Sequence, residues 1–322
     1  MSDVARVITV TPAPAIDRTY VVNTLELGEV HRATEVHAEL AGKGVNVASN
    51  LLVGNVASRA VVPLSIDDSA TLTSDVIVPH PVSQPIRVNI TVLEEGGRTT
   101  KINEEAPALS SAEWAGLVET TLSLAGDNRS PWILVAGTIP ACSDAPSLQL
   151  EDVFDTAHRQ GILVGLDTSG APLRDLARSG LPDLIKPNAP ELAECVGRDL
   201  RTLGDVIEAA EEVHHWGVEH VLVSLGPDGM IGVSASGVVH ASTAPVTVRN
   251  TIGAGDASVA GFLSHFVNHP DDFAVSVGTG VAWGALKVQE VSSQLHSLTG
   301  LPDAIVTDAP DRAQPLSEPG LI

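Results

Sequence analysis

Residues 162–168 read Ile-Leu-Val-Gly-Leu-Asp-Thr, an apolar run that ends at a carboxylate and a hydroxyl. The run is continuous rather than alternating, which indicates a strand covered by other elements on both faces. Similar runs recur at Val7–Val10, Trp132–Val135, Leu184–Ile185 and His220–Val223. We therefore expect residues 162–166 to form one strand of a larger sheet.

Helical stretches lie between these runs. Ser147–His158 precedes the run at 162–166, and Leu203–His214 precedes the run that begins at His220. An alternation of strands and helices favours a parallel sheet with helices on both faces. The predicted fold class is α/β, and 322 residues are enough for one large domain or two smaller ones.

Small or polar residues follow the predicted strands. They are Gly137-Thr138, Asp167-Thr168, Lys186-Pro187-Asn188 and Ser224-Leu225-Gly226. In open parallel sheets ligands bind outside the carboxyl ends of the strands. Four such endings in succession predict one shared site at that edge.

Two segments do not fit the alternation. Arg18–Val36 and Ile86–Ile102 look extended and partly polar, and Glu95–Arg98 has the composition of a hairpin turn. These segments predict a small second sheet outside the main one. The tail beyond Leu301 is rich in Pro and Asp, which predicts a peripheral, weakly ordered end.

The charge balance excludes one class of partner and disfavours another. Eighteen basic residues against forty acidic ones give a net charge of −22, so there is no basic footprint for nucleic acid or for anionic membranes. Cys142 and Cys195 lack metal-ligand spacing, no apolar run reaches the length of a membrane span, and the N-terminus shows no long apolar leader. We therefore expect a cytoplasmic protein. If its substrates are phosphates, its few Lys and Arg residues should be concentrated in one cleft.

The strongest local signal for chemistry is Asn250-Thr251-Ile252-Gly253-Ala254-Gly255-Asp256, followed by a largely apolar run. Small residues allow the backbone to approach a ligand, and the helix behind them directs free N–H groups and a positive dipole end at the same point. This arrangement suits a phosphoryl group, with Asp256 facing an incoming hydroxyl. The alternative is that Asp256 is only a helix cap.

A second glycine cluster, Ala41–Ala48, also opens a helix. It matches neither the phosphate-binding loop G-x-x-x-x-G-K-[ST] nor a dinucleotide fingerprint. Lys43 stands between the glycines at a helix N-terminus, where the helix dipole disfavours a cation. An anionic ligand would explain that placement, and a solvated lysine in an exposed turn is the alternative.

These stretches resemble the PfkB (ribokinase-like) carbohydrate kinases, and most closely the 1-phosphofructokinase and tagatose-6-phosphate kinase branch. Thr11–Asp17 is similar to the branch's N-terminal motif, and Gly28–Arg32 together with Gly42–Val47 resembles its substrate segment. Leu184–Glu191 is similar to the K-P-N-x-x-E element, and Ile252–Asp256 to the G-A-G-D signature.

The resemblance implies a single kinase domain over residues 1–322, with a ribokinase-like three-layer α/β/α fold, a mainly parallel central sheet and a small β-sheet lid. The lid would comprise about 17–37 and 85–104 and often also makes a homodimer, and 301–322 would be a peripheral tail. The implied cofactors are ATP and Mg²⁺. The implied site residues are Asp256 as base with Gly253, Ala254 and Gly255 as anion hole; Asp17, Arg32, Gly42, Lys43, Asn46, Arg87 and Asn103 for the sugar phosphate; Lys186, Asn188, Ser224 and Gly226 for the nucleotide; and Asn188 and Glu191 for the metal through water.

The cations of the substrate segment favour a phosphorylated sugar, since desolvated cations require an anion. Fructose 1-phosphate is the first choice by resemblance, ahead of tagatose 6-phosphate and fructose 6-phosphate. Ala13 and the short Ser65–Asp68 region depart from the family pattern. They leave open a catalytically weak sugar-phosphate-binding regulator. A third alternative is a nucleoside kinase, which would need an aromatic-lined neutral pocket. Only 3% of the residues are aromatic, so such a pocket is disfavoured.

Overall fold

The structure is a computed structural model that describes residues 5–72, 74–128 and 131–322. Residues 1–4, which carry the early acid of the N-terminus, lie outside this part. Within it, ten strands form one sheet in the order β15-β14-β13-β12-β10-β9-β8-β1-β4-β5. Neighbouring strands from β12 to β5 run parallel, whereas β13, β14 and β15 are antiparallel to their neighbours.

The apolar runs of the sequence are the inner strands of this sheet, as predicted. The ten strands of the whole sheet are β1 (Val7–Val10), β4 (Ser58–Leu64), β5 (Ile77–Pro81), β8 (Trp132–Ala136), β9 (Leu163–Asp167), β10 (Leu184–Ile185), β12 (His220–Ser224), β13 (Met230–Ser234), β14 (Gly237–Thr243) and β15 (Ala304–Thr307). In β8, Ile133 and Val135 join one core cluster while Trp132 and Leu134 join the other. Both faces are therefore covered, which explains the absence of alternation in the sequence.

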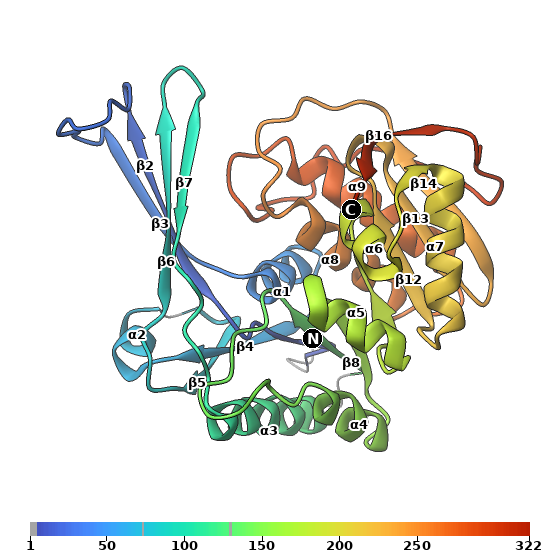
Figure 1. The fold of residues 1–322 in the computed structure, drawn as a ribbon, viewed down its shortest axis with the longest axis horizontal. Coiled ribbons are helices and arrows are strands. Elements are labelled where there is room, and N and C mark those ends of the chain that lie inside the picture. Colours follow the sequence, from blue (N-terminus) through green and yellow to red (C-terminus); the bar gives the residue numbers. More distant parts are fainter. Residues whose placement is uncertain (1–4, 73, 129–130) are drawn as a thin grey trace.

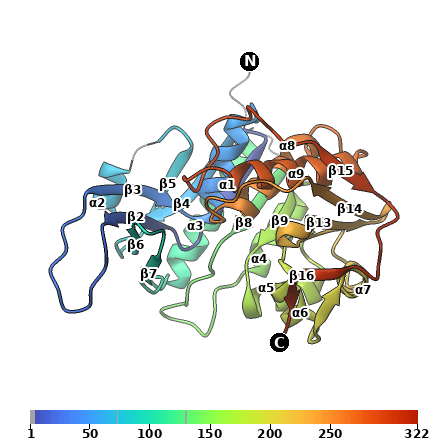
Figure 2. The ribbon, with the colours of Figure 1, turned by 90° about the horizontal axis from the view of Figure 1, so that it is seen from above.

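Helices cover the two faces, so the molecule has three layers (Figure 2). On one face lie α3 (Ser111–Asn128), α4 (Glu151–Arg159), α5 (Gly170–Ser179), α6 (Ala189–Val196) and α7 (Leu203–His215). On the other lie α1 (Lys43–Val53), α8 (Ala254–Phe266) and α9 (Phe273–Lys287). The helices predicted at 147–158 and 203–214 correspond to α4 and α7. Among the described residues, no helix combines the length and the apolar character needed to cross a bilayer.

A second sheet projects from one side of this body (Figure 1). Its strands are β2 (Ala15–Val22), β3 (Glu35–Ala41), β6 (Arg87–Glu94) and β7 (Thr99–Asn103), in the order β3-β2-β6-β7. The predicted segment Ile86–Ile102 contains β6 and nearly all of β7, whereas Arg18–Val36 overlaps β2 and β3 only in part, because residues 23–34 between them form a loop. Glu94–Arg98 closes the β6–β7 hairpin through a bond from the Gly97 N–H to the Glu94 carbonyl (2.8 Å). The short helix α2 (Ile66–Thr71) lies near its base (Figure 1).

The register of the small sheet separates a polar face from an apolar face. Asp17 pairs with Asn89, and Asn89 pairs with Asn103, so these three polar side chains share one face. Ile90 pairs with Ile102, and Val88 and Val92 lie two residues on either side of Ile90 on the opposite face. This division is what a sheet with one wet, ligand-facing side and one covered side requires.

The C-terminal residues differ from the expectation of a weakly ordered end. β15 pairs with β14 at the edge of the main sheet, and β16 (Pro315–Gly320) pairs with β11 (Leu200–Thr202). The backbone N–H and hydroxyl of Ser317 both donate to Asp228, and Leu316 is buried. The tail is peripheral, but the pairing with distant strands gives it regular structure that its Pro and Asp content did not indicate.

Candidate active site

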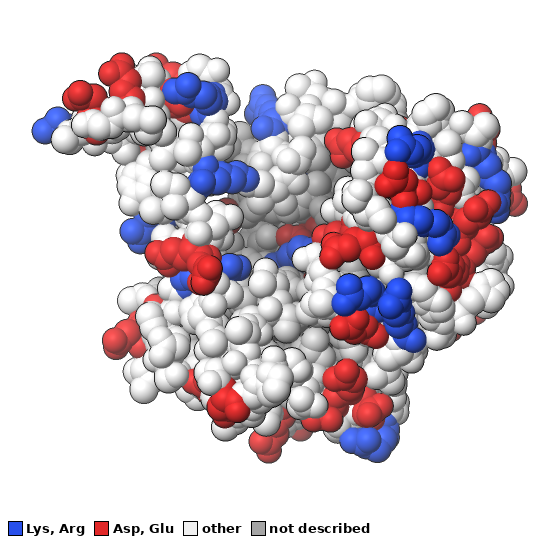
Figure 3. All heavy atoms as spheres, viewed as in Figure 1, with Lys and Arg blue, Asp and Glu red and all other residues white. Residues whose placement is uncertain are grey.

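A cavity of about 410 Å³ opens between the small sheet and the carboxyl ends of the parallel strands. Figure 3 shows the molecule hollowed at this point, with Lys and Arg atoms on the floor beside acidic residues. A cavity of about 590 Å³ between α3 and α4 is larger, but no strand end of the main sheet borders it. The polar strand endings thus identify the smaller cavity, which we call the cleft, as the candidate site.

The cleft brings together most of the residues singled out from the sequence. Its lining includes Asp17, Gly42, Lys43, Asn46, Arg87, Lys186, Asn188, Glu191, Ser224, Gly253, Gly255 and Asp256. Four others lie outside the lining. Ala254 is the first residue of α8 and Gly226 begins a 3₁₀ turn just beyond Ser224, while Arg32 and Asn103 are exposed on the small sheet and its connecting loop.

The glycine turn before α8 is built for close backbone approach. Gly253 has φ 81°, in the left-handed region, and a Cβ at this position would lie 2.0 Å from the Ser293 carbonyl oxygen. The Ala254 N–H donates to the Thr251 carbonyl. The next two N–H groups, of Gly255 and Asp256, have no backbone acceptor in the described residues. They point out of the N-terminus of α8 and can receive an anion.

Asp256 does not cap α8, because Gly253 is the N-cap residue and no side chain caps it. Instead the buried Asp256 carboxylate accepts a hydrogen bond from the Asn46 amide (2.8 Å). Burial, and next the negative charge of Asp167, raise the pKa of Asp256 to about 6. A carboxylate with a pKa near neutrality is well placed to exchange protons with a substrate hydroxyl.

Asp167, at the end of β9, anchors two lysines on the cleft floor. Lys43 Nζ lies 2.8 Å from Asp167 Oδ1, and Lys186 Nζ lies 3.6 Å from the same oxygen. Burial opposes ionisation of Asp167, but the charges of the two lysines keep its pKa below the ordinary value. Burial also opposes the charge of Lys43, yet Asp167 holds the pKa of that ammonium above its usual range.

Lys186 links this cluster to the glycine turn. Its ammonium would lie 3.3 Å from a Cβ on Gly255, and the side chain is 6% exposed. A positive charge therefore stands directly beside the free N–H groups at the start of α8. Together they form a site that stabilises a multiply charged anion such as a phosphoryl group.

Asn188 and Glu191 form a capping box at the start of α6. The Asn188 side chain accepts from the Glu191 N–H (2.8 Å), and Glu191 accepts from the Asn188 N–H (2.9 Å). No cluster of three or more His, Cys, Asp or Glu side chains suited to direct metal binding occurs in the part of the chain that the structure describes. A carboxylate and an amide at the cleft fit Mg²⁺ that keeps most of its water ligands.

The small sheet supplies the other wall of the cleft. The Asn89 amide donates to Asp17 Oδ1 (3.0 Å), and the Arg87 guanidinium donates to the Ala13 carbonyl (3.2 Å). The Arg87 Nε and Asn89 Oδ1 atoms are buried without a partner among the described residues. Buried polar atoms without partners indicate groups that a bound ligand would satisfy.

Three contributors to the site were not assigned a role from the sequence. Asp167 carried a signal, since it ends a predicted strand, whereas Asn89 and Gln294 carried none. Gln294 Nε2 donates to Asn46 Oδ1 (3.1 Å), so the other end of that amide is directed at Asp256. Such contacts join residues 248 positions apart and cannot be read from local sequence.

The two departures from the family pattern lie in different places. Ala13 lines the cleft and offers its carbonyl to Arg87. Ser65 caps α2, and Asp68 accepts from the N–H of Ile86 (2.9 Å), immediately before β6. The Ser65–Asp68 segment thus supports the base of the small sheet and is not part of the cleft lining.

Comparisons with known proteins agree with this site. Residues 10–299 match the model of the pfkB family of carbohydrate kinases. The 1-phosphofructokinase of Haloferax volcanii is 35% identical over 271 residues, which cover 80% of this chain and 83% of that protein.

Solved structures share the fold. The phosphofructokinase-2 of Escherichia coli in complex with fructose-6-phosphate is 26% identical and has a TM-score of 0.78, covering 88% of this chain and 94% of that one. Ribokinase from Thermotoga maritima has a TM-score of 0.66 at 24% identity, covering 89% and 94%, which supports the ribokinase-like architecture alone. The family match spans both walls of the cleft and the glycine turn, and the chain belongs to the pfkB family of carbohydrate kinases.

Proposed function

We propose that this protein transfers the γ-phosphoryl group of ATP to a hydroxyl of fructose 1-phosphate, giving fructose 1,6-bisphosphate. The observation that carries the proposal is the geometry at the start of α8, where the buried Asp256 carboxylate stands beside two free N–H groups and Lys186. Phosphoryl transfer depends on positioning and charge stabilisation more than on covalent chemistry. This cluster supplies both.

Each group has a distinct role in the proposed reaction. Asp256 accepts the proton of the attacking hydroxyl, and Asn46 holds the carboxylate in place. The Gly255 and Asp256 N–H groups, with Ala254 and Gly253 shaping the turn, receive the charge that develops on the transferred group. Lys186, Asn188, Ser224 and Gly226 hold the nucleotide. Bound Mg²⁺ would neutralise phosphate charge, and Asn188 and Glu191 would hold it through water.

The charge of the cleft supports a phosphorylated sugar. Lys43 and Arg87 both line the cleft; Lys43 contacts Asp167, and Arg87 contacts the Ala13 carbonyl on the small-sheet side. Unpaired donors such as Arg87 Nε favour an anionic substrate group, with Arg32 and Asn103 as further contacts from the small sheet. No aromatic side chain lines the cleft in the described residues, which disfavours a nucleoside as the acceptor. The relatives' activity on fructose 1-phosphate makes this sugar the first choice.

An ADP-coupled assay tests the proposal. Fructose 1-phosphate, fructose 6-phosphate, tagatose 6-phosphate, ribose and adenosine are compared at equal concentrations. We expect the highest kcat/KM with fructose 1-phosphate and no turnover with adenosine. Binding of the sugar phosphate without ATP consumption would instead identify the regulator suggested by Ala13.

Removal of Lys43 should weaken sugar-phosphate binding. We expect Lys43→Ala to raise the KM for the sugar phosphate about 10- to 100-fold, because a charge-assisted contact to the phosphate is lost. The KM for ATP should change much less. Steady-state kinetics with each substrate varied measure this, and Arg159→Ala, an exposed cation on α4, is the control. An equal effect on both substrates would place Lys43 on the nucleotide side.

Activity should fall in acid with a midpoint set by Asp256. Its pKa of about 6 means that the base is deprotonated above that pH and protonated below it. We therefore expect kcat/KM to drop about tenfold per pH unit below pH 6. The residual activity of Asp256→Asn controls for titration of the substrate's own phosphate, which also occurs near pH 6. If both proteins show the same profile, the midpoint does not report Asp256.

The small sheet supports a homodimer. Its apolar face carries Val88, Ile90 and Val92, which are only half-buried within one chain and belong to none of the core clusters. Leu27 (97% exposed) and Ile102 (59% exposed) lie in the same segments. A small sheet with an uncovered apolar face normally requires a partner. Val21, by register, lies on the polar face and does not contribute.

We expect light scattering at micromolar concentration to give a dimer in which the small sheets of two chains pack together. Ile90→Asp should produce a monomer with a raised KM for the sugar phosphate, because Arg87 reaches the cleft from the same sheet. Ile305→Asp, which alters an exposed residue of β15, is the control and should leave both properties unchanged. A fully active monomeric protein would show that the sheet works uncovered.

We place the protein in the cytoplasm, since ATP is available there and both Cys142 and Cys195 are free thiols.

A further inference from the structure

Lys287, the last residue of α9, is fully buried, although lysine is rarely fully buried without a charged partner. Its ammonium donates to the Asn250 carbonyl (3.3 Å), which is its only hydrogen-bond acceptor among the described residues. No carboxylate in that part of the chain lies within ion-pair distance of it. A buried charge without a direct counter-ion is costly and calls for a functional reason.

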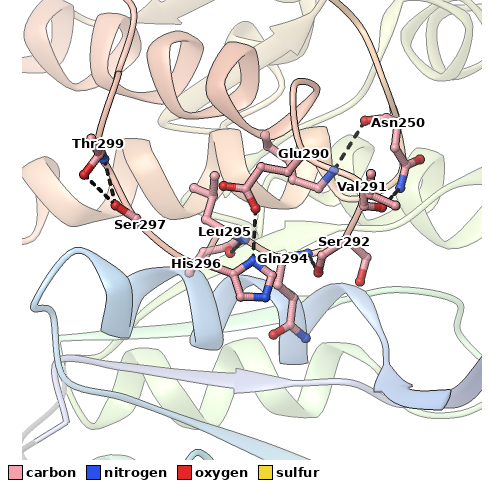
Figure 4. A network of polar contacts seen from close by, with 12 residues as sticks. Asn250, Glu290, Val291, Ser292, Gln294, Leu295, His296, Ser297 and Thr299 are labelled. Carbon is pink, nitrogen blue, oxygen red and sulfur yellow. Dashed lines mark hydrogen bonds and ion pairs between the residues drawn. The ribbon is translucent and has the colours of Figure 1, made fainter. Parts of the chain in front are cut away.

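The acceptor of this bond belongs to the glycine turn. The Asn250 amide donates to the Val291 carbonyl (2.7 Å) and its side-chain oxygen accepts from the Ile252 N–H (3.0 Å). Figure 4 shows Asn250 tied in this way to the loop that follows α9. A Cβ on Gly253 would lie 3.4 Å from Lys287 Cε, so the lysine stem packs directly beneath the turn.

The charge of the Lys287 ammonium interacts with that of the Asp256 carboxylate. Burial lowers the pKa of Lys287, while the carboxylates of Glu290 and Asp256 favour its charged form. The cleft side of the turn carries Lys186, and the buried side carries Lys287. Lys186 lies beside Gly255 and Lys287 beside Gly253, so both cations are next to the glycine turn that carries the free N–H groups.

We propose that Lys287 is a positioning residue for phosphoryl transfer, whose ammonium holds the Asn250 carbonyl and keeps a fixed positive charge behind the anion-binding N–H groups. This inference rests on the proposed function. Lys287 does not touch substrate, and it acts through the backbone of the Asn250–Gly253 turn.

Lys287→Met tests the charge, because methionine keeps the length and apolar volume of the stem. We expect kcat to fall about 10- to 100-fold, as for other residues that support a reacting group from behind. Each KM should change less than about threefold, since ground-state contacts are untouched. Leu286→Met, a volume-conserving change at the neighbouring residue, is the matched control and should keep wild-type kinetics. Wild-type kcat in Lys287→Met would overturn the proposal.

Chemical rescue adds a readout that does not depend on activity, namely the melting temperature. Lys287→Ala leaves a cavity beside the Asn250 carbonyl, and ammonium or methylammonium chloride should raise its melting temperature and restore part of kcat. Sodium chloride at equal ionic strength should do neither, and the wild-type protein should respond to all three salts alike. If the salts act equally on the variant, the cation site is disproved. The proposed function can also fail by itself. In that case the wild-type protein phosphorylates no sugar phosphate, while ammonium still raises the melting temperature of Lys287→Ala.

Lys287→Gln covers the case in which the alanine variant does not fold. Glutamine can donate to the Asn250 carbonyl without a charge. Loss of kcat in this variant at a wild-type melting temperature would support the role of the charge, whereas full kcat would reduce the role to a hydrogen bond and overturn the electrostatic part of the proposal.

Discussion

Replacement of Asp256 by asparagine is expected to lower kcat about 10²- to 10⁴-fold while leaving ATP binding nearly intact. The change keeps the size of the side chain and removes its ability to accept a proton. Asn46 would face an amide in place of the carboxylate that it contacts at 2.8 Å, a small structural change. Steady-state kinetics and a direct ATP-binding titration measure the two effects separately.

Asp205→Asn is the matched control for this experiment. Asp205 is also in the first turn of a helix, α7, and there it forms a capping box with Thr202. We expect this variant to lose some stability but to keep wild-type turnover. If Asp256→Asn behaved in the same way, with near wild-type kcat, the proton acceptor would lie elsewhere.

Replacement of Asp167 by leucine is expected to have the largest effect on stability. The 1% exposed carboxylate lies between Lys43 and Lys186, and its removal leaves two cations without their counter-ion. Breaking a buried ion pair from one side costs about 3–5 kcal/mol. Urea unfolding of the two proteins at pH 7 measures the difference in the free energy of unfolding.

The pH dependence of this effect has a definite sign. The pKa of Asp167 is lowered in the folded protein, so its contribution is fully present above the ordinary aspartate value of 3.8 and is lost as the pH falls below it. Asp175→Ala, which removes an exposed carboxylate beside Arg174, is the control and should change stability little. A stability loss in Asp167→Leu no larger than in this control would mean that the two lysines find water or other partners.

Much of the fold follows from local sequence. A strand covered on both faces must be apolar throughout, so runs such as Trp132–Val135 identify the inner strands. The carboxyl ends of parallel strands meet at one edge, so Asp167 and Lys186 could be expected near a common site. The small residues before α8 indicate an anion-binding turn because close backbone approach excludes larger side chains. These inferences rest on periodicity, residue size and chain direction, which are properties of short segments.

Other features depend on contacts between distant residues. Regular structure in the tail comes from the pairing of β15 with β14 and of β16 with β11. The raised pKa of Asp256 comes from burial and from the nearby Asp167. Lys287 appears in the sequence as an ordinary lysine at a helix end, and only packing shows that it is buried beneath the glycine turn. The sequence determined which segments form strands, helices and the anion-binding turn, whereas the tertiary structure decided which charges face one another, because burial and distance arise only when the chain is folded.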